Sequence, residues 1–219
     1  MVSPSSPSLS PGKPGVPADP DYLPGSVQQS AKILVVGAFG VGKTTLIGSV
    51  SEIRPLRTEE TMTVNSKGID DLAGLPDKTT TTVAMDFGRI TLGQSTVLYM
   101  FGMPGQHRFW PLWHGLTEGA IGALVLVDTR RLDASFEVLD LLEERADELP
   151  LVVAINHFPD SPGHDPADVR RALDLRPQTP VLDCNARDRV SSITALAELT
   201  RHALKADNRY ALTAEKGSL

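Results

Sequence analysis

The sequence lacks three features that mark large classes of protein: paired cysteines, a long apolar run and an excess of positive charge. Its one cysteine, Cys184, excludes an internal disulfide framework and a cysteine-rich zinc site, and it suits a reducing compartment. Its longest apolar stretch, around residues 120 to 127, is far shorter than the roughly 18 to 20 residues of a membrane-spanning helix. The N-terminus has no basic-then-apolar signal pattern. We therefore expect a cytoplasmic protein with no direct membrane insertion.

Positive charge is outweighed along the chain. The sequence has 21 Lys and Arg residues against 27 Asp and Glu residues, which gives a formal net charge of -6 at pH 7. Binding to nucleic acid or to an anionic membrane surface depends on basic residues that neutralise phosphates. We therefore predict no nucleic-acid partner.

Proline is unevenly distributed along the 219 residues. Seven of the 17 prolines lie within the first 25 residues, among serines: Pro4, Pro7, Pro11, Pro14, Pro17, Pro20 and Pro24. Such a segment cannot bury enough apolar surface to offset the entropy lost on ordering. We predict a disordered tail over residues 1–30, one folded domain over residues 31–206 and a short C-terminal extension over residues 207–219.

From residue 31 onward, short apolar runs alternate with helical patterns. Residues 32–37 (KILVVG) form a continuous apolar run, which is typical of a strand buried on both faces. Further strands are expected at residues 82–87, 96–101, 121–128, 151–156 and 180–184, with helices around residues 132–142 and 193–204. This alternation predicts an α/β fold with a mostly parallel, six-stranded sheet covered by helices on both faces. The consecutive strands at 82–87 and 96–101 predict one antiparallel strand at the sheet edge.

The first predicted strand is followed by GAFGVGKTT at residues 37–45, which matches the phosphate-binding pattern GxxxxGK[ST]. Glycines let backbone N–H groups turn inward to a phosphate, and the following helix directs its positive dipole end there. Lys43 supplies a charge for the β- and γ-phosphates, and the Thr44 hydroxyl is a ligand for Mg2+. The predicted nucleotide-binding residues are Gly37, Ala38, Phe39, Gly40, Val41, Gly42, Lys43, Thr44 and Thr45. The pattern predicts a P-loop protein that binds a nucleoside triphosphate, without indicating which one.

A second motif, FGMPGQHRFW at residues 101–110, follows a later predicted strand. It resembles the switch II motif of Ras-like small GTPases, in which a glycine contacts the γ-phosphate and a glutamine orients the attacking water. Gly105 and Gln106 match these two positions. The aspartate that holds magnesium in those GTPases is replaced by Gly102. Asp86, on the preceding strand, is a candidate substitute, and a strand-end acid that faces solvent is the other interpretation.

Together, these motifs resemble the GTPases encoded in actinobacterial conservons, which are related to the bacterial polarity GTPases of the MglA type. The resemblance covers residues 31–206 and implies a Ras-like fold, with Lys43, Gln106 and a first-switch threonine acting in slow hydrolysis of GTP to GDP. Within the threonine run at residues 79–82, Thr82 is the threonine expected to sense magnesium and the γ-phosphate, with Thr81 as the second candidate. The polar stretch at residues 53–81 is then a loop that forms the first switch.

The base-binding loops match the Ras-like pattern only in part. After residues 151–156, the usual NKxD becomes NHFPD, which keeps Asn156 but has His157 for the lysine and Asp160 one residue late. Asp160 either reaches the base or begins the next turn. In the last base loop, the Ala186 N–H is expected near the base O6, with Arg187 over the base. Guanine is implied mainly by the resemblance, and adenine stays an alternative.

The resemblance implies a GTP-binding signalling switch whose partners are a roadblock-type regulatory protein and a sensor-kinase-like protein, the latter at the membrane. Two alternatives stay open: a nucleotide-bound adaptor with little hydrolysis, and an ATP-specific P-loop ATPase. Phe109, Trp110 and Trp113 follow the second motif and form either a buried aromatic cluster or an effector surface.

Overall fold

The computed structural model describes residues 29–54, 56–63, 80–93, 96–105, 113–146 and 148–216. Most of the predicted tail lies outside these ranges. The elements are β1 (Gln29–Val36), α1 (Lys43–Val50), β2 (Leu56–Thr63), β3 (Thr80–Leu92), β4 (Thr96–Gly102), α2 (Trp113–Thr117), β5 (Ala120–Val127), the 3-10 helix η2 (Thr129–Ser135), α3 (Phe136–Ala146), β6 (Leu151–Asn156), α4 (Pro166–Ala172), β7 (Val181–Cys184) and α5 (Arg189–Lys216). Helix α5 therefore continues into the predicted C-terminal extension. Among the described residues, no helix is both long and apolar enough to cross a membrane.

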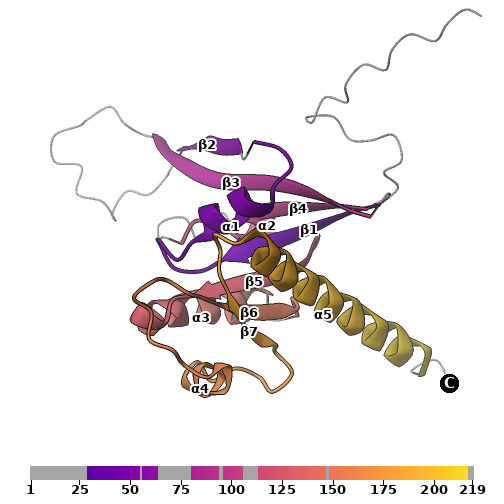
Figure 1. The fold of residues 1–219 in the computed structure, drawn as a ribbon. Coiled ribbons are helices and arrows are strands. Elements are labelled where there is room, and N and C mark those ends of the chain that lie inside the picture. Colours follow the sequence, from indigo (N-terminus) through magenta and orange to yellow (C-terminus); the bar gives the residue numbers. More distant parts are fainter. Residues whose placement is uncertain are drawn as a thin grey trace, which may run out of the picture.

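The strands form one seven-stranded sheet in the order β2-β3-β4-β1-β5-β6-β7 (Figure 1). β4, β1, β5, β6 and β7 are parallel to one another, whereas β3 is antiparallel to both β2 and β4. The predicted α/β fold, with a mostly parallel sheet and one antiparallel strand, is confirmed. Two details of the prediction are corrected: the sheet has a seventh strand, and the antiparallel strand β3 is not at the edge, because β2 pairs with its outer side.

The additional strand β2 lies inside the stretch that was expected to be a loop. Its sequence, LRTEETMT, has charged residues among its few apolar ones and no continuous apolar run. An edge strand is held by backbone hydrogen bonds to one neighbour, here β3, so its side chains need not be apolar. The hydrophobic pattern along the sequence therefore carries little signal for this strand.

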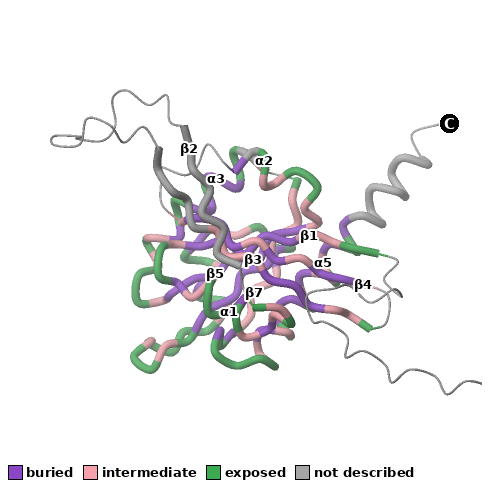
Figure 2. The backbone as a smooth tube through the Cα atoms, turned by 90° about the horizontal axis from the view of Figure 1, so that it is seen from above, coloured by how far each residue is buried: buried purple, intermediate pink, exposed green. Residues whose placement is uncertain are grey.

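The central strand β1 directs alternate side chains into two hydrophobic cores. Ile33 and Val35 pack with residues of α1 and α5 on one face of the sheet. Leu34 and Val36 pack on the other face with residues of α3, of α4 and with Trp113 of α2. All four strand residues are fully buried, which explains the continuous apolar run in the sequence. Figure 2 shows the buried residues along the central strands.

The parallel strands end at one edge of the sheet, and the sequence motifs follow them there. Val35 of β1 is in register with Gly102 of β4 and with Leu124 of β5, and Asn156 of β6 is in register with Cys184 of β7. The loops after these strands therefore meet at the carboxyl edge, which is where open α/β sheets bind their ligands.

Candidate nucleotide-binding site

The loop between β1 and α1 has the backbone of a phosphate-binding loop. Gly37, Gly40 and Gly42 have φ values of 140°, 77° and 108°, in the region that favours glycine. A Cβ on Gly37 would lie 2.5 Å from the Leu126 carbonyl oxygen, and one on Gly42 would lie 2.5 Å from Asn156 Nδ2. Both ends of the loop therefore require glycine, because of the backbone conformation and because of close packing.

Lys43, the first residue of α1, folds its side chain back over this loop. Its Nζ donates hydrogen bonds to the carbonyl oxygens of Gly37 and Ala38, both at 2.8 Å. Desolvation lowers the pKa of Lys43 to about 8, and the nearby Asp86 carboxylate opposes part of this shift. An ammonium group held over glycine-rich backbone in this way is placed to neutralise the charge of a phosphate.

The remaining loop residues differ in exposure. Val41 is buried and fills the space inside the turn, where a Cβ on Gly37 would contact it at 2.9 Å. Phe39, at the outer side of the loop, is 69% exposed. Thr45 is exposed on the first turn of α1. The predicted contacts of Phe39 and Thr45 with a nucleotide stay predictions.

The Thr44 hydroxyl donates a hydrogen bond to the Asp86 carboxylate. Asp86 lies on β3 directly opposite Gly102 of β4. A Cβ on Gly102 would lie 3.0 Å from the Cβ of Asp86 and 3.0 Å from Cδ1 of Ile47, so side chains at both 86 and 102 would crowd each other. Hydroxyl and carboxylate oxygens are ligands that Mg2+ prefers. In the pair of β3 and β4, the acid is therefore Asp86 on β3. The oxygens of Thr44 and Asp86 fit a magnesium site.

The second motif begins directly against the phosphate-binding loop. A Cβ on Gly105 would lie 2.6 Å from the Gly37 carbonyl oxygen and 2.9 Å from the Phe39 nitrogen. Only glycine fits at this position, and the structure therefore places Gly105 beside the loop. Gln106, the residue expected to orient water, lies outside the described residues.

Of the three aromatic residues that were expected to form either a buried cluster or an effector surface, Trp113 is described by the structure. Trp113 is only 1% exposed, and its Nε1 donates a hydrogen bond to the Pro104 carbonyl oxygen at 3.4 Å. Trp113 therefore belongs to the core between α2 and the sheet. Phe109 and Trp110 lie outside the described residues.

Thr82, the predicted first-switch threonine, lies in β3 and is paired there with Thr61 of β2. It precedes Asp86 by four residues on the same strand. At a rise of about 3.4 Å per residue, the backbones of Thr82 and Asp86 are roughly 14 Å apart. The described part of the chain does not include the Thr82 side chain, and its role as a magnesium ligand stays a prediction.

Asn156 connects two loops from a buried position at the end of β6. Its side chain is 3% exposed, and its Nδ2 donates a hydrogen bond to the Val41 carbonyl oxygen at 2.8 Å. Its Oδ1 accepts a hydrogen bond from the Ala186 N–H at 2.9 Å. Asn156 thus holds the phosphate-binding loop against the loop after β7. The Ala186 N–H, which was expected near a base, is bonded to Asn156 in this structure.

The other predicted base-loop residues are engaged in surface ion pairs and turns. His157 Nε2 lies 2.7 Å from an oxygen of Asp183, and Asp160 accepts a hydrogen bond from Arg130 at 2.7 Å. Arg187 is exposed at the turn after β7. The predicted base residues therefore lie at the carboxyl edge beside the phosphate-binding loop, and Asp160 is bound by an arginine.

That arginine belongs to a group of three residues that the sequence analysis did not single out: Asp128, Arg130 and Arg131. Asp128 directly follows β5, and its buried carboxylate binds Arg130. Arg131 contacts the phosphate-binding loop at Phe39. One feature of the sequence could have indicated this group: Asp128 directly follows a strongly apolar strand. A charged residue in that position lies at the carboxyl edge of the sheet.

The fold and the site at its carboxyl edge define a P-loop nucleotide-binding protein. A family model of conserved hypothetical ATP binding proteins matches residues 35–206. The chain belongs to this family. A comparison with curated proteins gave no match.

Two solved structures share the fold. The small GTPase Arl6 (BBS3) from Trypanosoma brucei, with the nucleotide analogue GppNp bound, is 15% identical to this chain, with a TM-score of 0.59. The match covers 81% of this chain and 99% of that one. The G domain of the FeoB iron transporter of T. maritima is 17% identical, with a TM-score of 0.52, and the match covers 81% of this chain and 99% of that one. At these identities the likeness shows the fold alone, which this chain shares with those two structures.

Proposed function

We propose that the protein is a GTP-binding switch of the conservon type, which binds GTP and GDP with Mg2+ and hydrolyses GTP slowly. The observation that carries this proposal is the group formed by Lys43, Thr44 and Asp86 at the phosphate-binding loop. It combines an ammonium, a hydroxyl and a carboxylate at the end of the first parallel strand. Gly105, the first residue of the second switch, packs on the same loop, which supports a switch that responds to the terminal phosphate.

Each residue has one part in this mechanism. The loop N–H groups and Lys43 would bind the phosphates, and Thr44 and Asp86 would hold Mg2+. When bound, Mg2+ neutralises phosphate charge. Gln106 orients the attacking water, and Gly105 lets the backbone approach the nucleotide. Thr82, which is paired with Thr61 of β2 in this structure, would join the site on binding of the triphosphate only if this end of β3 leaves the sheet.

The proposal also includes a preference for GTP over ATP. GTP is supported by the resemblance to conservon GTPases and by the small-GTPase fold. A second candidate, an ATP-specific P-loop ATPase, is favoured by one observation: the carboxylate of Asp160, which would read guanine, is bound to Arg130. The family description, ATP binding, points the same way. The third candidate function is a nucleotide-bound adaptor that uses the same site with little hydrolysis.

Binding titrations separate these candidates. Fluorescent GTP, GDP and ATP analogues are titrated against the purified chain, with and without Mg2+, and single-turnover hydrolysis is then measured with the nucleotide that binds. A GTP switch binds GTP and GDP more tightly than ATP and hydrolyses GTP slowly. Equal or tighter binding of ATP would contradict the GTP assignment, and tight GTP binding without hydrolysis would favour the adaptor.

Two variants test the residues behind the assignment. Lys43→Ala is expected to abolish nucleotide binding, because the loop then loses the ammonium that is folded over it. Gln106→Leu is expected to preserve binding and to reduce hydrolysis, because it removes only the residue that orients water. Unchanged binding by the Lys43 variant would contradict the proposed site.

The partners follow from the same resemblance. We propose that a roadblock-type regulatory protein and a sensor-kinase-like protein bind the nucleotide-loaded form and place it at the membrane indirectly. Pull-down of the two partners with the GTP-loaded and GDP-loaded chain tests this, and equal recovery in both states would contradict a switch.

A further inference from the structure

Asp128 occupies a central position between the two loops that flank a nucleotide. It directly follows β5, which lies in the sheet between β1, before the phosphate-binding loop, and β6, before the base loop. Its side chain is only 3% exposed. Arg130 grips this carboxylate with two side-chain hydrogen bonds, from Nε at 2.9 Å and from Nη2 at 2.8 Å, and its backbone N–H adds a third at 3.0 Å. Such bidentate pairs fix both direction and distance.

Arg131 extends from the same acid to the phosphate-binding loop. Its Nη2 donates a hydrogen bond to the Phe39 carbonyl oxygen at 3.1 Å, and its Nε lies 3.8 Å from Asp128 Oδ2. A Cβ built on Gly40 would lie 3.6 Å from the same Nη2. The Arg131 backbone, with φ -144° and ψ 54°, departs from the helical conformation of η2.

Arg130 extends in the other direction, to the base loop. Its Nη1 donates a hydrogen bond to Asp160 Oδ1 at 2.7 Å. Its guanidinium carbon lies 3.9 Å from the ring centroid of Phe158, within the range of a cation–π contact. One side chain therefore holds both an acid and an aromatic ring of the loop that follows β6.

We propose that Asp128, Arg130 and Arg131 form an arginine clamp that ties the phosphate-binding loop to the base loop and slows nucleotide release. The inference rests on the proposed nucleotide-binding function and adds positioning residues to that site. A nucleotide at this site would contact one loop with its phosphates and the other with its base, so contacts that hold both loops in place are expected to slow its release. The clamp links them through a buried carboxylate, and opening it breaks several charge-assisted hydrogen bonds.

Asp128 and Arg130 keep their charges over the pH range in which proteins bind nucleotides. Hydrogen bonding from Arg130 lowers the pKa of the Asp128 carboxyl and raises the pKa of Arg130 above its ordinary value. Both partners therefore keep their charge. His157, which replaces the lysine of the usual base motif, points to Asp183.

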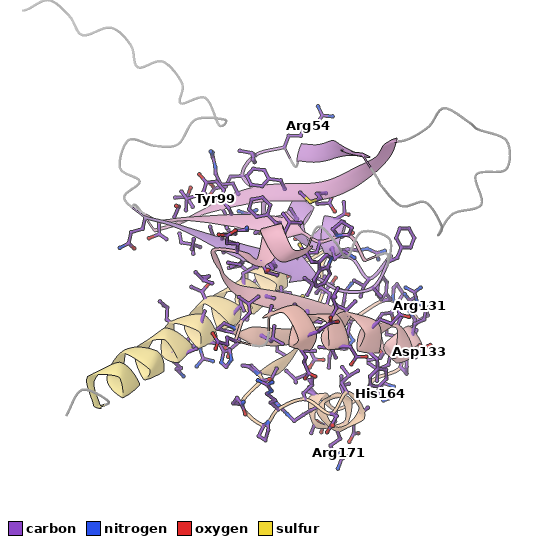
Figure 3. All side chains as sticks on the ribbon, turned by 180° about the vertical axis from the view of Figure 1, so that it is seen from behind. Arg54, Tyr99, Arg131, Asp133, His164 and Arg171 are labelled. Atoms are coloured by element: carbon purple, nitrogen blue, oxygen red, sulfur yellow. The ribbon has the colours of Figure 1, made fainter. Side chains whose placement is uncertain are left out.

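The test measures how fast a fluorescent GDP or GTP analogue dissociates from the full chain after mixing with excess unlabelled nucleotide. Arg130→Ala and Arg131→Ala are each expected to speed dissociation by about tenfold, with little change in the association rate. The double variant is expected to be less than additive, because both arginines act through Asp128. Arg171→Ala is the control: this exposed arginine lies on α4, away from Arg131 (Figure 3), and pairs only locally, with Asp168.

Lysine variants distinguish a clamp from a general packing role. Arg131→Lys keeps one donor for the Phe39 carbonyl and is expected to restore slow release. Arg130→Lys cannot bind Asp128 with two donors and Asp160 with a third, so it is expected to stay fast. Dissociation within twofold of the unsubstituted chain in both alanine variants would overturn the clamp while leaving the nucleotide-binding function intact. A chain that binds no GDP, GTP or ATP would overturn the proposed function and the clamp together.

Discussion

Asp86 lies directly opposite Gly102 in the antiparallel pair of β3 and β4, and its carboxylate accepts a hydrogen bond from the Thr44 hydroxyl. In the Ras-like pattern, an acid at the position of Gly102 holds magnesium from the end of its own strand. Here the acid is on the neighbouring strand and reaches the same threonine. Because a side chain at 102 would contact the Cβ of Asp86, the glycine and the displaced acid depend on each other.

Asp86→Asn is expected to remove the effect of Mg2+ on nucleotide affinity, with a loss of about tenfold or more in affinity when Mg2+ is present. The amide keeps the size of the side chain but removes the charge that Mg2+ requires. The measurement is a titration with a fluorescent nucleotide in Mg2+ and in chelator. Asp140→Asn, an exposed acid on α3, is the matched control. An Asp86 variant that still tightens its binding with Mg2+ would exclude this carboxylate as a ligand.

A second prediction concerns variants in which Asp86 and Gly102 exchange their residue types. Gly102→Asp alone is expected to lower the free energy of unfolding by about 1–3 kcal/mol, because its side chain crowds both Asp86 and Ile47. The double variant Asp86→Gly with Gly102→Asp removes the contact with the Asp86 side chain, keeps the one with Ile47, and returns an acid to the strand end. We expect it to recover both stability and the Mg2+ response relative to the single variants. Equal stability of the single and double variants in urea unfolding would contradict the crowding.

Nucleotide affinity is expected to fall as the pH rises above about 8. Burial lowers the pKa of Lys43 from 10.5 to about 8, so the unliganded loop loses this ammonium in that range. The phosphates are fully ionised by then and favour the charged lysine, so binding near pH 8 takes up a proton. Titration calorimetry in two buffers with different ionisation heats measures this uptake. Affinity that is constant between about pH 7 and 9, with no proton uptake, would contradict the lowered pKa.

Deprotonation of Lys43, which lowers nucleotide affinity as the pH rises, is expected to raise the stability of the nucleotide-free chain. Between pH 8 and 10.5, the unfolded chain holds a proton on Lys43 that the folded chain has released. The contribution of Lys43 to the free energy of unfolding therefore rises with pH in this window.

Asn156→Ala is expected to lower the free energy of unfolding by about 2–4 kcal/mol, because the buried Val41 carbonyl and Ala186 N–H both lose their partner. The substitution also separates the phosphate-binding loop from the loop after β7, so nucleotide affinity falls with stability. Urea unfolding measures the first effect. Asn185→Ala, which removes only a local hydrogen bond to the Arg187 N–H, is the control and is expected to cost less. Equal losses in the two variants would show that Asn156 has no special bridging role.

Several strands could be predicted because their burial is visible as an apolar run in their own sequence. Strand β6 has the bounds 151–156 that its apolar run predicts, and β1 is central because its alternate side chains are buried on both faces. The edge strand β2 was missed because its pairing depends on the backbone of β3, which periodicity does not reveal. The substitute role of Asp86 was one of two interpretations; its position opposite Gly102 and its hydrogen bond with Thr44 support this role, which stays a prediction.

By itself, the sequence determined the class of this protein. The glycines at 37, 40 and 42, followed by Lys43 and Thr44, require a phosphate-binding loop, because positive φ angles and a helix start are properties of a few neighbouring residues. Only the tertiary structure decided which distant groups complete the site. The contacts of Asp86 with Thr44 and of Arg131 with Phe39 join residues 42 and 92 positions apart. Their geometry depends on which strands are neighbours in the sheet, and strand order is settled by the packing of the whole domain rather than by any single segment.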